Sequence, residues 1–385
     1  MTAPARVPHP RWTSPKGARG PLGSLLASQG LVICVGSGGV GKTTTAAALG
    51  IAAATAGRRT AVLTIDPARR LRDALGITTL DGEPHRVPLA RHEPAARGLL
   101  DAMILDTKRT FDDLIRRYAP TEAAAERVLQ NRIYESISTA LAGSQEYMAM
   151  ERLHAIATAR TYDLLVVDTP PTQHALDFLE APERLIALLT SRAATILQNP
   201  SLILAREGSR IAQAALTAVL RGLERFTGFE MLRDVAEFVG GLEQFSAGFQ
   251  ERAATVARFL RAPATSFLLV TTAEAARVAE TLAFHRELLR TGLPFAGFVV
   301  NRVLPPSLLG TPPFPDVERV AEPEVALGRK LVAVHRRFAA LVKAERAEIA
   351  RLRAAAPAAL VVEVPLATDE PSSLARLVTL SNELA

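Results

Sequence analysis

The stretch from Gly36 to Thr43 constrains the fold more than any other part of the chain. It has the pattern G-x-x-x-x-G-K-S/T, and it lies between the apolar run Leu31–Val35 and an alanine-rich stretch that begins at Lys42. A strand, a glycine-rich loop and a helix in this order point backbone N–H groups and the positive end of a helix dipole at a phosphate. The sequence therefore predicts a nucleotide-binding site; the alternative is a chance glycine-rich turn.

Each residue type in this loop suits one part of a nucleotide. We expect Lys42 to contact the β- and γ-phosphates, which makes it a candidate catalytic residue, and the hydroxyl of Thr43 to bind Mg²⁺. The predicted nucleotide-binding residues of the loop are Gly36, Gly38, Gly39, Val40, Gly41, Lys42, Thr43 and Thr44.

Strand-like and helix-like stretches alternate along most of the 385 residues. Short apolar runs rich in β-branched residues predict strands, and helical stretches separate them, as in a parallel sheet with helices on both faces. The fold class predicted is therefore α/β: a P-loop NTPase with a mostly parallel, doubly wound sheet and an α-helical insertion subdomain. The predicted strands are 31–35, 60–65, 101–105, 163–168, 265–271, 295–300 and 360–364.

The predicted domain organisation is a disordered tail over 1–27, an ATPase domain formed by 28–180 and 263–385, and a helical insertion over 181–262. The tail is rich in proline and arginine. The insertion holds many large apolar residues at helical spacing. They form either an ordinary core or a groove for an apolar partner, and the sequence leaves both open.

Composition and charge exclude some classes of function. The net charge of +6 comes without a compact basic run, so we expect no nucleic-acid partner. The single cysteine, Cys34, excludes a disulfide or an all-cysteine metal site within one chain, and its place in a predicted strand indicates a buried thiol. The first 30 residues lack the apolar region of a secretory signal, and no apolar run is long enough to span a bilayer. We expect a cytoplasmic protein.

Two acidic residues lie at the carboxyl ends of predicted strands. Ligands of parallel sheets bind at the carboxyl ends of the strands, so Asp66 and Asp168 are expected to point at the phosphates. Asp66 is a candidate catalytic residue and metal ligand, which would orient the attacking water or hold the water shell of the metal; the alternative is a helix cap. Asp168 ends an apolar strand in the manner of a Walker B aspartate and is predicted, with Thr43, to hold Mg²⁺.

Together these motifs resemble the arsenite-pump and tail-anchored-protein-targeting ATPases, and most of all their actinobacterial arsenite-ATPase-like members. The resemblance rests on the loop, on Asp66-Pro67-Ala68, on Gly143-Ser144-Gln145-Glu146 and on Asp168-Thr169-Pro170-Pro171-Thr172 with His174. It implies a dimer that encloses ATP and Mg²⁺, with Glu146 near the partner subunit. It further implies that Asn301 binds adenine, to which an amide offers a donor and an acceptor, and that Pro365 and Leu366 form the adenine loop.

Two departures from the family pattern matter. The second position of the family loop is usually a lysine that reaches the partner's phosphates, and here it is Ser37. The sequence therefore favours a heterodimer with a lysine-bearing paralogue over a homodimer; replacement by Arg69 or Arg70, or slow turnover, are alternatives. The family's cysteine pairs are also missing, which makes stimulation by arsenite improbable, since soft ions prefer thiolates.

The leading hypothesis is a dimeric Mg²⁺-dependent ATPase that acts on a hydrophobic protein client or a membrane-associated partner. One alternative is the motor subunit of an anion or metalloid efflux system. Another is a nucleotide switch that positions itself on a membrane, which predicts a terminal basic amphipathic helix that residues 374–380 do not provide. Peripheral association with a membrane is compatible with all three.

Overall fold

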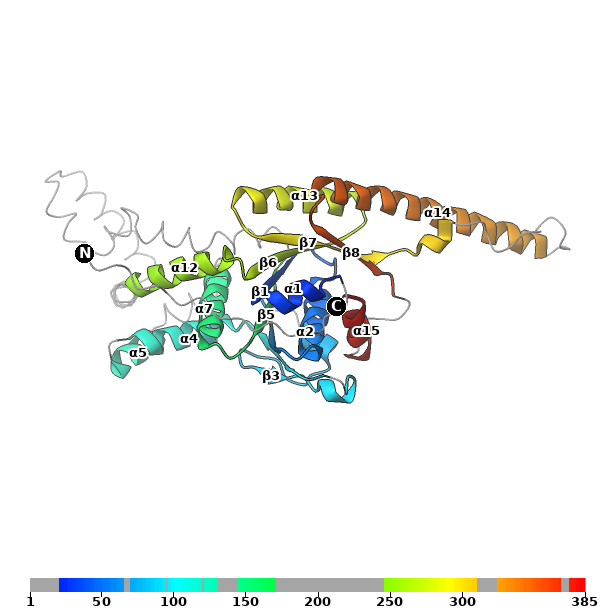
Figure 1. Cartoon of the computed structure of the whole chain (residues 1–385). Coiled ribbons are helices and arrows are strands. Elements are labelled where there is room, and N and C mark those ends of the chain that lie inside the picture. The colour runs from blue at the N-terminus through cyan, green and yellow to red at the C-terminus, as the bar shows by residue number, and fades with distance from the viewer. Residues whose placement is uncertain are drawn as a thin grey trace, which may run out of the picture. The chain divides into compact units, whose positions relative to one another are not determined.

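The computed structural model of the chain describes residues 21–65, 70–94, 96–119, 121–130, 144–170, 246–309, 324–367 and 374–384 (Figure 1). Its strands are β1 (Leu31–Val35), β2 (Arg59–Thr64), β3 (His85–Arg86), β4 (Leu99–Ile104), β5 (Leu164–Asp168), β6 (Thr265–Thr272), β7 (Phe295–Val303) and β8 (Leu360–Pro365). Its helices are α1 (Gly23–Ser28), α2 (Lys42–Thr55), α3 (Arg70–Leu75), η1 (Leu89–Arg91), α4 (Thr107–Tyr118), α5 (Glu122–Leu129), α7 (Ser144–Ala159), α12 (Ser246–Leu260), α13 (Ala275–Arg290), η2 (Pro306–Leu309), α14 (Glu324–Ala355) and α15 (Leu374–Leu384). Among these described residues, no helix is both long and apolar enough to cross a membrane.

All eight strands lie in one sheet, in the order β3-β4-β2-β5-β1-β6-β7-β8. Every neighbouring pair is parallel except β3 and β4. The three central strands, β5, β1 and β6, are buried along their whole length, which explains why each contains an uninterrupted apolar run, 164–167, 31–35 and 267–270. The prediction of a mostly parallel α/β sheet is confirmed.

The chain leaves the centre of the sheet in two directions. The β1-α2-β2 connection runs toward β4, whereas β6-α13-β7-α14-β8 runs the opposite way. Because crossovers between parallel strands are right-handed, opposite directions place α2 on one face and α13 with α14 on the other. The sheet is therefore doubly wound, as predicted, and the crevice for a ligand lies where the direction changes, at the carboxyl end of β1.

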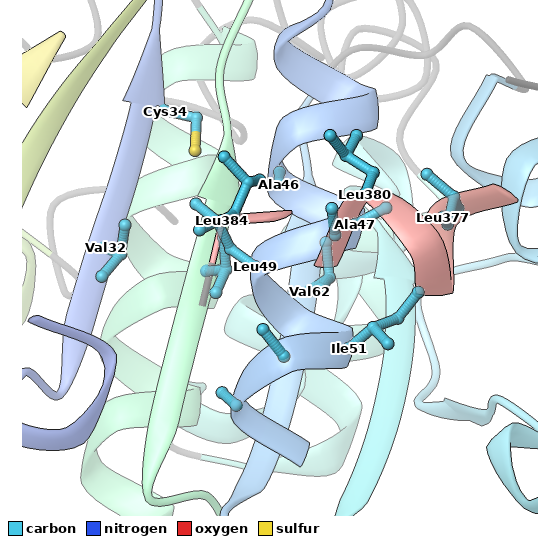
Figure 2. Close-up of a cluster of buried hydrophobic side chains, with 14 of the residues drawn as sticks. Val32, Cys34, Ala46, Ala47, Leu49, Ile51, Val62, Leu377, Leu380 and Leu384 are labelled. Carbon is cyan, nitrogen blue, oxygen red and sulfur yellow. The ribbon is translucent and has the colours of Figure 1, made fainter. Parts of the chain in front are cut away.

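Helix α2 is buried on nearly all sides. Figure 2 shows its residues Ala46, Ala47, Leu49 and Ile51 among side chains of the sheet and of the C-terminal helix α15, the latter represented by Leu377, Leu380 and Leu384. Small alanine side chains let the helix approach both neighbours closely, and they explain why an alanine-rich helix stands here. This packing fixes the first turn of α2 against the sheet.

The N-terminal boundary of the fold differs from the prediction. The tail predicted over 1–27 ends too late, because Gly23–Ser28 form α1 and the side chains of Leu22, Leu25 and Leu26 are buried. The buried Arg58 holds this segment: its guanidinium donates to the carbonyls of Leu26 and Gln29 and to that of Asp163 before β5. Residues 1–20 lie outside the described residues.

The chain divides into two compact units. The first comprises 1–104, 160–175 and 261–385, and carries the sheet; the second comprises 105–159 and 176–260. The second unit includes 105–159, which the sequence predicted to lie in the ATPase domain. Most of the predicted insertion, 181–262, lies outside the described residues, so its boundaries and its groove stay predictions.

The described helices of the second unit are α4, α5, α7 and α12. Asp106 and Thr121 cap α4 and α5, since their side chains accept hydrogen bonds from the backbone N–H groups of Arg109 and Ala124. Helices α7 and α12 are joined by a buried ion pair in which Arg252 Nε lies 2.8 Å from both carboxylate oxygens of Glu151. This pair ties together two helices that are about 100 residues apart in the chain.

Candidate functional site

The loop from Gly36 to Gly41 joins the carboxyl end of β1 to the first turn of α2. A Cβ at Gly36 would lie 2.1 Å from the carbonyl oxygen of Val270 in β6, so only glycine allows the loop to leave the sheet here. Gly38 and Gly39 are exposed, with no atom near the places where their Cβ atoms would be. The tip of the loop therefore offers bare backbone and free space, as a phosphate requires.

Gly41 lies just before α2, with a φ of 99° that favours glycine. A Cβ there would lie 2.2 Å from the amide nitrogen of Asn301. That nitrogen donates to the carbonyl oxygen of Val40 at 2.9 Å, and the Asn301 amide oxygen accepts from the N–H of Arg302 at 2.9 Å. An irregularity of the β7–β8 pairing between Val300 and Val303 accompanies this turn of the side chain toward the loop.

Pro365 and Leu366 lie at the end of β8, on the same edge of the sheet. The N–H of Leu366 donates to the carbonyl oxygen of Val303 at 2.9 Å, two residues beyond Asn301. Both residues are exposed. The structure thus brings the three predicted adenine-binding residues to one end of neighbouring strands; their role stays a prediction.

Lys42 is buried, although it carries a charged amine. Its Nζ donates to the carbonyl oxygen of Ser37 at 2.9 Å, so the side chain folds back over the loop. The next residues, Thr43 and Thr44, lie in the first turn of α2, where backbone N–H groups have no acceptor within the helix. An ammonium group and helix N–H groups around one open loop fit the phosphates of a nucleotide.

Thr43 and Asp168 meet beneath the loop. The Thr43 hydroxyl donates to Asp168 Oδ2 at 2.7 Å, and the Thr64 hydroxyl at the end of β2 donates to the same oxygen at 3.0 Å. Strand register explains the meeting, since Asp168 lies opposite Thr64 on one side and Cys34 on the other. A hydroxyl beside a carboxylate is a donor set that suits Mg²⁺.

Asp66 and His174 lie outside the described residues, as does Gly143. Ile65, the residue before Asp66, donates its backbone N–H to the carbonyl oxygen of Asp168 at 2.9 Å. The backbone of Glu146 lies in α7, but its side chain is not among those described. The roles of these residues stay predictions.

Cys34 is fully buried in β1. Burial, with the nearby charge of Asp168, raises the pKa of its thiol far above the usual range. The backbone of this residue is also occupied, because its carbonyl oxygen accepts a hydrogen bond of 2.9 Å from the Thr169 hydroxyl. A protonated thiol inside a strand is a poor ligand for a soft metal ion.

Sequence reasoning missed Glu280, a residue of α13. The buried Ser37 hydroxyl donates to Glu280 Oε2, and Arg277 Nη1 lies 3.3 Å from the same oxygen. The Ser37 hydrogen bond, together with Arg277, lowers the pKa of the Glu280 carboxyl. The one available signal was that α13 follows β6, a neighbour of β1, so its first turns lie near the phosphate loop.

Comparison with known proteins agrees with this geometry. The model of the family described as Anion-transporting ATPase matches residues 30–310. Protein Rv2184c of Mycobacterium tuberculosis is 37% identical over 155 residues, which are 38% of this chain and 36% of that protein. The ATPase GET3 of Malassezia globosa is 29% identical over 161 residues, 41% of this chain and 44% of the relative.

A longer match exists with the ATPase get3 of Aspergillus terreus, which is 25% identical over 281 residues, 70% of this chain and 72% of the relative. The Mycobacterium and Malassezia relatives are matched over less than half of their own length. The family model, in contrast, covers strands β1 to β7 and ends before α14 and β8.

Proposed function

Because the chain belongs to the Anion-transporting ATPase family, we propose that it binds ATP with Mg²⁺ at the phosphate loop and hydrolyses it to ADP and phosphate. The observation that carries the proposal is the hydrogen bond from Thr43 to Asp168 directly below the loop that Lys42 covers. A loop that merely turned the chain would not need a buried lysine and a buried carboxylate at its base.

In this proposal Thr43 and Asp168 hold Mg²⁺, with Asp66 as a further metal ligand. Mg²⁺ bound there would neutralise charge on the phosphates. Lys42 exchanges the Ser37 carbonyl oxygen for phosphate oxygens, while the N–H groups of the loop and of Thr44 hold the remaining ones. Asp66 orients the attacking water.

We propose that Asn301 binds the adenine edge and that Pro365 and Leu366 cover the ring. Support comes from the place of all three residues at the end of β7 and β8, with Asn301 hydrogen-bonded to the loop. The amide has capacity left for adenine, because its nitrogen keeps a second N–H beside the one donated to Val40, and its oxygen keeps a second lone pair beside the one that accepts from Arg302.

The active form in this proposal is a dimer with a lysine-bearing paralogue, which acts on a hydrophobic protein client or a membrane-associated partner. Ser37 supports the heterodimer, since this chain lacks the lysine that the family resemblance implies for a symmetric dimer. A soft-metal efflux motor is less well supported, because the sole cysteine, Cys34, is buried in β1.

Nucleotide binding and hydrolysis are tested separately with the purified full-length chain. Binding is measured with a fluorescent ATP analogue, and hydrolysis as release of phosphate with Mg²⁺. Lys42→Ala should abolish binding, whereas Asp66→Asn should bind nearly as well as the natural chain and hydrolyse more slowly. The matched control is Lys108→Ala, in which an exposed lysine of α4 paired with Asp112 is removed instead.

The outcomes separate the parts of the proposal. Absence of nucleotide binding by the natural chain would refute the proposed function. Tight binding with fast hydrolysis by the isolated chain would refute the heterodimer only. Loss of binding in Asp66→Asn would show that Asp66 serves binding instead of hydrolysis.

A further inference from the structure

Five large apolar side chains are exposed along the N-terminal half of α14. Their exposed fractions lie between 38% and 58%, whereas most other large apolar side chains among the described residues are buried. The residues are Leu327, Leu331, Val334, Phe338 and Leu341, called here the α14 stripe. A row of such side chains is a larger apolar surface than single exposed leucines provide, and it indicates an interaction site.

The spacing of the α14 stripe is regular. Successive members are four, three, four and three residues apart, an average of 3.5. This is the repeat of a coiled-coil seam, in which each side chain packs between four side chains of a neighbouring helix. The 15 residues involved extend about 21 Å along the helix axis, which is long enough for two complete heptads.

The other half of α14 is firmly attached to the sheet unit. Val342, Ile349 and Leu352 are fully buried, and Arg346 and Arg353 both form ion pairs with Glu363 of β8. Figure 1 shows the consequence: the C-terminal part of α14 lies beside α13, and its N-terminal part extends away from the sheet. The α14 stripe is thus presented on a rigid helix, which reduces the entropy lost on binding.

Charge decides which kind of helix fits. Between Glu324 and Lys343 the helix carries five basic residues, Arg329, Lys330, Arg336, Arg337 and Lys343, against one acid, Glu324. Lys330 and Arg337 directly precede Leu331 and Phe338, at the edge of the stripe. A second copy of α14 would bring like charges to this edge, whereas acidic residues of another helix would pair with them.

We propose that the α14 stripe binds an amphipathic helix of a partner protein whose apolar seam is flanked by acidic residues. A membrane surface fits less well, because the stripe is narrow. The neighbouring Val332 and Ala339 are partly buried, and the other neighbours include the small Gly328, Ala333 and Ala340, so the broad apolar face of a membrane-bound helix is missing. Small neighbours instead let a second helix come close.

The test uses the full-length protein and two labelled helical peptides of four heptads. Both have leucine and isoleucine on the seam; one has glutamate at all flanking positions, and the other has lysine there. Fluorescence anisotropy should show binding of the acidic peptide that weakens as salt is raised, with the basic peptide at least tenfold weaker. Leu331→Ser combined with Phe338→Ser should weaken the acidic peptide at least tenfold.

The control is Leu289→Ser, which removes a leucine of α13 that is more exposed than Leu331 or Phe338 and should leave peptide binding unchanged. Because all these side chains are exposed, circular dichroism and thermal unfolding should match the natural protein. Three results would overturn the proposal: equal binding of both peptides, binding that survives the double substitution, and no peptide binding while anionic phosphatidylserine vesicles bind. Self-association through the stripe, lost in the double variant and unaffected by the acidic peptide, would overturn it as well. The readouts need no nucleotide, so they are independent of the proposed ATPase.

Discussion

The Ser37 hydroxyl of the phosphate loop donates a hydrogen bond to the Glu280 carboxylate of α13. Two residues that are far apart in the chain thus place a negative charge beside a loop that suits anions. At this loop position the family resemblance implies a lysine, so the local charge is opposite in sign to the one expected. The pair gives this loop an electrostatic character that the glycine pattern alone does not reveal.

Glu280→Gln should strengthen nucleotide binding by about two- to fivefold, because it removes a carboxylate that repels the phosphates. The side chain is half exposed, so the effect stays on the order of 0.5–1 kcal/mol. The measurement is the dissociation constant of a fluorescent ATP analogue at low and high salt, and the gain should shrink as salt screens the charge. Glu287→Gln, on the same helix but paired with Arg290, is the matched control. Weaker binding in Glu280→Gln would mean that the carboxylate supports the loop more than it repels the ligand.

Thr43→Val should lower nucleotide affinity in the presence of Mg²⁺ by about tenfold or more, since it removes the hydroxyl that contacts Asp168. Affinity without Mg²⁺ should change little. Thr43→Ser keeps the hydroxyl and serves as the control. Titrations with and without a chelator provide the measurement, and an equal loss under both conditions would contradict the assignment of Thr43 to the metal.

The buried His285 should make stability depend on pH. Its ring lies 4.4 Å from that of Phe295 and 5.5 Å from that of Phe298, and burial lowers its pKa. The unfolded chain then binds a proton at a higher pH than the folded one. Neutral His285 contributes fully to the unfolding free energy above about pH 6.5, the usual pKa of histidine. This contribution is lost as the pH falls toward and through the lowered pKa of the folded state.

His285→Phe should therefore reduce the loss of unfolding free energy between pH 7.5 and pH 5, measured by urea denaturation. The exposed His92 provides the control, and His92→Phe should keep the slope of the natural protein. The slopes of unfolding free energy against pH are compared between variant and natural protein. His154, whose pKa is also lowered mainly by burial, contributes to the slope of both. An unchanged slope in His285→Phe would refute the role of this ring.

Arg252→Met should destabilise the second unit by about 3–5 kcal/mol, because it leaves Glu151 buried without its cation. Burial raises the pKa of the Glu151 carboxyl even though Arg252 opposes the shift. Adding Glu151→Leu to this variant should restore much of the stability, since an apolar pair needs no charge compensation. Chemical denaturation of the four proteins of this double-mutant cycle gives the coupling energy between Arg252 and Glu151. A coupling energy near zero would contradict the prediction.

Much of the sheet could be predicted because its strands have clear sequence signals. All seven predicted strands exist, and their ends differ from the prediction by at most three residues. Strand β3 was missed, since His85 and Arg86 form only two residues of antiparallel pairing with β4 and no apolar run marks them. Local patterns detect elements that bury side chains, and β3 buries little.

Within the site, proximity along the chain decided what could be predicted. The phosphate loop is one continuous stretch, and Asp168 ends a strand with a recognisable pattern. The contact of Glu280 with Ser37 depends on strand order and on the rotation of α13, neither of which local spacing encodes. The apolar spacing of α14 can be read from the sequence. Only the structure shows that the residues of the α14 stripe are exposed.

The place of β1 in the sheet also sets the order in which the protein can mature on the ribosome. Val35, the residue before the phosphate loop, pairs with Leu269, while Ile33 pairs with Val167 on the other side. Roughly 230 residues must be added after Val35 before its last partner is made, which takes about 10–50 s at usual rates of translation. During that interval the apolar strand β1 lacks at least one of its two neighbours, so the earliest-made part of the nucleotide site is among the last to be completed.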